Sequence, residues 1–259
     1  MMRVFVSALI LSLFLFAKPG FVLADYQKSY DDYTYNFSKY RDAHNTYDIA
    51  KSTYATYKTL TAKEEAIKQT RLVLQSRDKL MSSYYDLLYE KLLTMPAISN
   101  EQRGTFFTMK ESEKKWMENH QKVLDAASTL EDLNSASGQF EEHFHQFDSE
   151  TKQAIGMVLL SKSDVLLAKW SNQAESISNQ FKIISSSGED VGLGERGIVS
   201  ARNKKEMAVT KIESARAILT KNDYSKINLF DAQQKLTEGM QYLREATQFL
   251  QEVMKGITG

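Results

Sequence analysis

Cysteine, proline and glycine are scarce in this chain, and their scarcity limits the folds it can adopt. The 259 residues include no cysteine, two prolines and eleven glycines, whereas average usage would give roughly 13 prolines and 18 glycines. A disulfide framework is therefore excluded. Because most turns depend on glycine or proline, few turns and long elements are expected, and a collagen-like or β-sandwich fold is disfavoured.

An excess of one charge sign is also missing. The chain carries 33 basic and 33 acidic residues, so it has neither the basic excess nor the basic stripe that nucleic-acid binding uses. We expect no nucleic-acid partner. Hydrophobic residues make up 42% of the chain, which is enough for a core and argues against wholesale disorder.

The first 24 residues have the layout of a secretory signal peptide. Arg3 precedes an apolar run over 4–17, which is shorter than the roughly 20 residues that a spanning helix needs. A Lys-Pro-Gly break at 18–20 and small residues near 22–24 predict cleavage between Ala24 and Asp25. An uncleaved N-terminal anchor is the alternative. No later segment reaches spanning length, so we expect an exported protein, secreted, periplasmic or associated with the cell envelope, with no membrane span after signal removal.

The remaining chain predicts about six long helices. Thr61 with Glu64, and Ser99 with Gln102, have the spacing of capping boxes, and Thr129 with Asp132 suggests another helix start. The expected helices cover 25–58, 62–94, 100–127, 139–184, 198–220 and 225–257.

Three apolar rows with a seven-residue spacing support this interpretation, because such a repeat keeps one helix face against a neighbour. The rows are Tyr26, Tyr33, Tyr40, Tyr47 and Tyr54; Leu60, Ile67, Leu74, Met81 and Leu88; and Leu229, Leu236, Leu243, Leu250 and Ile257. The predicted fold is all-α, an elongated antiparallel helical bundle that is coiled-coil-like. Its expected regions are the signal at 1–24, an N-terminal helical region at 25–128 and a C-terminal helical region at 129–259 with a Gly-rich hinge near 185–197.

Motifs associated with catalysis or cofactors lack their structural context. Residues 192–197 fit G-x-G-x-x-G, but three serines rather than a strand precede them, so no nucleotide cofactor is expected. His143 and His145 are two apart and point to different sides of a helix. Glu141 and His145 could supply only two metal ligands, so we predict no metal site, and we expect both histidines at the surface. No catalytic residues are predicted, and the protein is not expected to be an enzyme.

The tyrosine stripe (Tyr26, Tyr33, Tyr40, Tyr47 and Tyr54) is the least ordinary feature of the sequence. A tyrosine ring is apolar, but its hydroxyl needs a hydrogen-bond partner when buried. The stripe is expected to fill the edge of the bundle core. The alternative is that it forms a surface for a protein or glycan partner.

Part of the first half of the chain carries a family resemblance. The matching features are the tyrosine spacing, the run Tyr40-Arg41-Asp42-Ala43, and Leu60-Thr61 leading through Glu64 and Arg71 to Arg77-Asp78. Over 33–85 the chain resembles exported, coiled-coil-like helical proteins predicted from genomes of ultra-small candidate-phylum bacteria. The resemblance implies export and helical structure and no particular activity.

These observations predict an exported, non-enzymatic structural or protein-interaction protein of the cell envelope or extracellular space. Its partner would be an unknown protein or a second copy of the chain. Two alternatives are a membrane-acting helical protein, suggested by the apolar stretch at 155–160, and a glycan or small-ligand binder using the tyrosine stripe.

Overall fold

The computed structural model describes residues 24–186, 192–221 and 226–258, which form six long helices and no strand. The predicted all-α fold is therefore confirmed. The helices are α2 (Ala24–Tyr57), α3 (Leu60–Leu93), α4 (Asn100–Ala126), α5 (Leu130–Ser186), α6 (Gly192–Leu219) and α7 (Leu229–Thr258).

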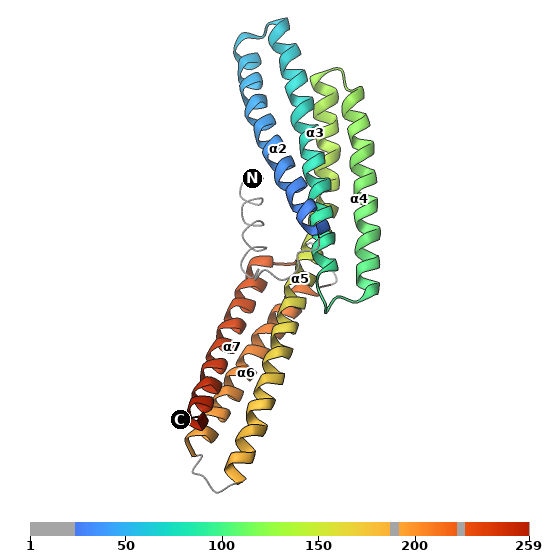
Figure 1. The fold of residues 1–259 in the computed structure, drawn as a ribbon. Helices are drawn as coiled ribbons and strands as arrows, with labels where there is room; N and C mark the ends of the chain where they lie inside the picture. Colours follow the sequence, from blue (N-terminus) through green and yellow to red (C-terminus); the bar gives the residue numbers. More distant parts are fainter. Residues whose placement is uncertain (1–23, 187–191, 222–225, 259) are drawn as a thin grey trace.

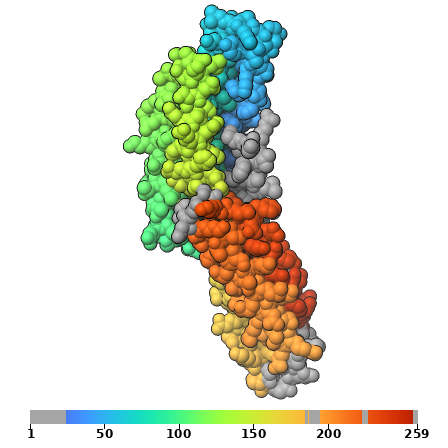
Figure 2. Space-filling view, turned by 180° about the vertical axis from the view of Figure 1, so that it is seen from behind, coloured from blue at the N-terminus to red at the C-terminus, as the bar shows by residue number. Residues whose placement is uncertain are grey.

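The helices form two bundles that lie end to end and share α5 (Figure 1). One bundle contains α2, α3, α4 and the first half of α5. The other contains the second half of α5 with α6 and α7. With 57 residues at about 1.5 Å per residue, α5 is about 85 Å long. The molecule is accordingly an elongated rod with a bend where the bundles meet (Figures 1 and 2).

Each bundle has its own apolar core. In the four-helix bundle, Tyr85, Leu88 and Leu92 of α3 are fully buried beside Phe106 of α4, and Phe140 and Phe147 of α5 belong to the same core. In the three-helix bundle, small residues alternate with larger ones. Its core includes Leu160, Trp170, Ala208, Ile212, Ala215, Leu243, Ala246 and Leu250. Small side chains such as Ala208 of α6 and Ala246 of α7 allow these two helices to approach each other closely.

The helix starts confirm two capping predictions and correct one. Ser99 and Gln102 form the expected reciprocal capping box. Thr129 and Asp132 also bond reciprocally, each side chain accepting from the other's backbone N–H. The start of α3 was wrongly placed at Thr61, because Thr59 is the cap and accepts from the Ala62 N–H. The chain turns at Lys58, whose φ is +52°, so α3 begins directly after α2 ends.

The helix expected at 139–184 begins earlier than predicted, because α5 runs unbroken from Leu130 to Ser186. Of the expected hinge near 185–197, residues 187–191 lie outside the described part of the chain, whereas Gly192 to Gly197 belong to α6. The predicted regional division at 128/129 falls in the turn between α4 and α5, while the two bundles share α5.

The seven-residue rows of α3 and α7 lie largely in the cores. Leu74, Met81 and Leu88 are buried in α3, as are Leu236, Leu243 and Leu250 in α7. At the start of the α3 row, Leu60 is exposed, because it is the first residue of the helix. The spacing thus identified the buried faces correctly except at a helix end.

A close approach of α6 and α7 makes Gly239 sensitive to substitution. A β-carbon there would lie 3.2 Å from the Ala208 carbonyl oxygen and 3.2 Å from Cγ1 of Ile212. We predict that Gly239→Leu destabilises the protein by about 1–3 kcal/mol through overpacking, measured by denaturant unfolding. Gly104→Leu is the matched control, because nothing lies within 4 Å of a β-carbon there. The control should gain up to about 1 kcal/mol from helix propensity, and equal effects of the two changes would refute the close-packing explanation.

Candidate functional site

The four-helix bundle contains a buried polar cluster where α3, α4 and α5 face one another. Its members are Arg77 and Asp78 of α3, Glu113, Trp116 and His120 of α4, and Phe140 and His143 of α5. Buried ionisable groups are costly unless they are paired. The partners of each group therefore decide what the cluster can do.

His120 bonds to two acceptors at once. Its Nδ1 lies 2.6 Å from Oδ2 of Asp78, and its Nε2 lies 2.9 Å from the Ala136 carbonyl oxygen. A carbonyl oxygen can only accept, so Nε2 carries a proton. If the Asp78 carboxylate is ionised, Nδ1 carries one too, and the two residues form a buried imidazolium–carboxylate pair. Asp78 and His120 are 0% and 3% exposed, so this pair ties three helices together in the dry interior.

Trp116 lies between the two histidine rings. Its ring is stacked 3.9 Å from that of His143, at an interplanar angle of 5°, and 4.9 Å from that of His120, at 11°. His143 Nε2 lies 2.7 Å from Oε2 of Glu113, so each histidine has its own carboxylate. A protonated ring stacked on an indole is favoured by the electron-rich face of the indole.

The other charges of the cluster are desolvated. Burial raises the pKa of Glu113, and its hydrogen bond to His143 opposes that rise. Burial also lowers the pKa of Arg77, against the attraction of Asp78. The Arg77 guanidinium lies 3.4 Å from the centre of the Phe140 ring, and its Nε lies 3.6 Å from Oδ1 of Asp78, which is longer than a hydrogen bond. Arg77 is thus held by ring stacking and by charge attraction.

A second buried contact lies farther along the same bundle. The Tyr85 hydroxyl donates to Oε2 of Glu150 at 2.7 Å, and Gln146 donates to the other carboxylate oxygen at 3.0 Å. Burial, followed by the charge of Glu150, raises the pKa of Tyr85. Together with the histidine pairs, this contact fixes the register of α3 and α4 against α5.

Chemically, the cluster pairs acids with bases inside the core. Within the described ranges, no group of three His, Cys, Asp or Glu side chains is placed to hold a metal ion. The prediction that His143 lies at the surface is wrong, since its side chain is only 16% exposed. His145 is exposed as expected.

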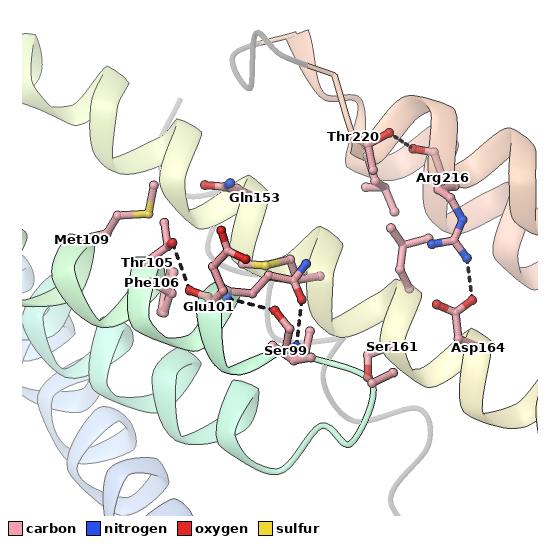
Figure 3. Close-up of a pocket in the computed structure, with 16 residues that line it drawn as sticks. Ser99, Glu101, Thr105, Phe106, Met109, Gln153, Ser161, Asp164, Arg216 and Thr220 are labelled. Atoms are coloured by element: carbon pink, nitrogen blue, oxygen red, sulfur yellow. Dashed lines mark hydrogen bonds and ion pairs between the residues drawn. The ribbon is translucent and has the colours of Figure 1, made fainter.

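A pocket of about 650 Å³ lies between the two bundles (Figure 3). It is bordered by the start of α4, the middle of α5 and the end of α6. Ile98, Phe106, Leu160 and Leu219 are buried residues that form its apolar wall. Its polar lining includes Glu101, Ser161, Asp164 and Arg216, and the last two form an ion pair with 2.5 Å between Oδ1 and a guanidinium nitrogen. The sequence offered no sign of this pocket, because its residues come from three distant segments.

The tyrosine stripe lies along the α2 face that packs on α3. Tyr33 is buried, with its ring centre 5.5 Å from that of Tyr84. The other four are half-buried, and Tyr26 has the Lys91 ammonium 4.8 Å from its ring centre. Tyr40 and Tyr47 pack against the core clusters. Whether their outer edges contact a partner stays a prediction.

The predicted cleavage site between Ala24 and Asp25 lies at the edge of the described residues, and residues 1–23 lie outside them. No helix in the described part of the chain combines the length and apolar character needed to cross a bilayer. Comparison of the chain with models of protein families, with curated proteins and with solved structures gave no match.

The buried cluster predicts a large penalty for removing Asp78. In Asp78→Asn, the Arg77 guanidinium and the His120 ring would lose the carboxylate that they share in the core, so the free energy of unfolding should fall by about 3 kcal/mol. Asp86→Asn is the matched control. Asp86 pairs with Lys114 at 3.0 Å but is 33% exposed, and its loss should cost less than about 1 kcal/mol. Denaturant unfolding of both variants at pH 7 measures the difference, and similar losses would contradict a special role for the buried pair.

Tyr33 should make stability pH-dependent at alkaline pH. Burial, with a smaller contribution from Tyr30, raises its pKa to about 12 from the ordinary value of 10.0. The fold therefore favours the neutral phenol, and this contribution is complete below pH 10 and lost as the pH rises from 10 to 12. Tyr33→Phe should reduce the loss of stability between pH 9 and 11.5, measured by denaturant unfolding. The exposed Tyr35→Phe should leave it unchanged; an unchanged loss in Tyr33→Phe would count against the burial effect.

Proposed function

We propose that this chain is an exported, non-enzymatic structural or protein-interaction protein of the cell envelope or extracellular space. The observation that carries the proposal is the 57-residue helix α5, which runs unbroken through both bundles (Figure 1). A continuous helix shared by two cores holds the ends of a long molecule apart. That geometry suits a spacer or scaffold that contacts other molecules at its ends.

Apolar side chains are exposed at both ends of the rod. Ile49, Tyr57 and Leu60 lie near the α2–α3 turn and are 68–73% exposed. Ile183 and Val199 lie near the other end, where α5 finishes and α6 begins, and both are more than half exposed. Exposed apolar groups gathered at one place favour contact with another protein.

The buried acids and bases also support a non-enzymatic role. The Asp78–His120 and Glu113–His143 pairs join helices within the core, and the Tyr85–Glu150 contact does the same. Groups used in this way stabilise the register of a bundle, and a reacting molecule would have to displace packed side chains to reach them.

The test is whether binding depends on the ends of the rod. Residues 25–259 would be incubated with envelope extract and cross-linked, and self-association would be followed by analytical ultracentrifugation. The double variant Ile49→Ser/Leu60→Ser should lose the cross-linked partner or the oligomer. Phe230→Ser is the control, because Phe230 is 79% exposed but lies at the start of α7, near the middle of the rod (Figure 1).

Loss of binding in the control variant alone, or in neither variant, would contradict interaction through the α2–α3 end. Export is tested separately by mass spectrometry of the protein recovered outside the cytoplasm. The expected mature N-terminus is Asp25, and recovery of the full-length chain in the membrane fraction would favour the anchor instead.

A further inference from the structure

The pocket between the bundles has a combination of features that the proposed scaffold role does not require. It is walled on one side by buried apolar residues and on the other by polar groups from three helices (Figure 3). Its volume of about 650 Å³ lies within the roughly 300–1,000 Å³ typical of small-molecule sites.

Ser161 supplies a hydrogen-bonding group that the fold leaves unused. It is 3% exposed, lines the pocket, and its Oγ has no hydrogen-bond partner among the described residues. Serines in helices commonly donate to the carbonyl four residues earlier, and Ser163 next to it does so, to Leu159. A buried hydroxyl without a partner is costly, so a ligand that bonds to Ser161 would recover this cost.

The charges of the lining favour a cation. Arg216 already forms ion pairs with Asp164 and with Glu213. Glu101 projects into the pocket with no ion pair among the described residues, so the lining carries two acids against one base. The C-terminus of α6, at Leu219, also borders the pocket. The partial negative charge of a helix C-terminus attracts cations.

The start of α4 does not reverse this preference. Its N-terminal amides would attract an anion, but the Ser99 hydroxyl already accepts from the Gln102 N–H and the Gln102 side chain from the Ser99 N–H. Glu101 in the same first turn offsets the positive end of the helix.

We propose that this pocket binds a small organic cation with an apolar body, with its ammonium group donating to Glu101 and to Ser161 and its apolar part against the Phe106–Leu219 wall. Such a ligand would contact α4, α5 and α6 at once. It would therefore add a contact between the two bundles, which α5 already joins.

Met109 and Met157 line the pocket and provide the readout. The mature chain labelled with ¹³C-methyl methionine would be titrated with hexylammonium, with hexanoate at equal ionic strength and with hexanol, and followed by NMR. Hexylammonium should shift the Met109 and Met157 signals saturably. The signal of Met207, which is exposed on α6 and outside the pocket, should not move. Hexanoate should bind at least about fivefold more weakly.

Variants separate the pocket from general surface binding. Ser161→Ala should weaken hexylammonium binding about threefold to tenfold, the effect of one hydrogen bond, and Glu101→Gln about threefold. Thr105→Trp should block the pocket, because Thr105 is an exposed lining residue. Thr108→Trp is its matched control, since Thr108 is exposed on the same helix but does not line the pocket. Circular dichroism of each variant confirms that it is folded.

A last arm distinguishes a free amine from a lipid headgroup, because both carry the same cationic chemistry. Hexylammonium and monomeric dihexanoyl-phosphatidylethanolamine share a primary ammonium group, which can donate hydrogen bonds. Shifts with the first alone support a free ligand, and shifts with both support a headgroup. Equal binding of hexanoate, shifts unaffected by Thr105→Trp, or no saturable shift at all would each overturn the proposal, and none of these results bears on the end contacts of the scaffold.

Discussion

The whole structure depends on α5 serving two different cores with one continuous helix. Its first half presents Phe140 and Phe147 to the aromatic core formed with α3 and α4. Its second half presents Leu160 and Trp170 to the small-residue core formed with α6 and α7. Because α5 is one continuous helix, the side of the helix that faces the first core determines which side faces the second.

The buried charges specify that register rather than add to stability. A buried ion pair gains little over well-packed apolar side chains, whereas a broken one is costly. A displaced α4 would separate His120 from Asp78 and Glu113 from His143 together. Alternative packings of these helices, which an apolar core would tolerate, are thereby excluded. Specificity of this kind is valuable in a chain that has no disulfide and few turns to restrict its topology.

Local signals in the sequence were enough to predict the helices, and long-range contacts were not. The Ser99–Gln102 cap and the leucine rows act within one helix, so spacing alone revealed them. The Asp78–His120 pair joins residues 42 apart in sequence, and only packing brings them together. The hinge prediction was wrong at Gly197, because this position lies against Val253 of α7 and requires a small residue within a helix. The same reasoning explains the missed pocket, whose lining depends on how the two bundles meet.

The two tryptophans fall in different bundles, which gives the molecule a built-in pair of optical reporters. Trp116 is stacked between two imidazole rings in the four-helix bundle, so its indole has polar ring neighbours on both faces. Trp170 is buried in the core with α6 and α7, away from any histidine ring contact. Unfolding of the first bundle would separate Trp116 from both imidazole rings, and unfolding of the second would move Trp170 from an apolar to an aqueous setting. Fluorescence of the unlabelled protein can therefore distinguish a rod that melts as one unit from one in which α5 frays out of a single bundle at a time.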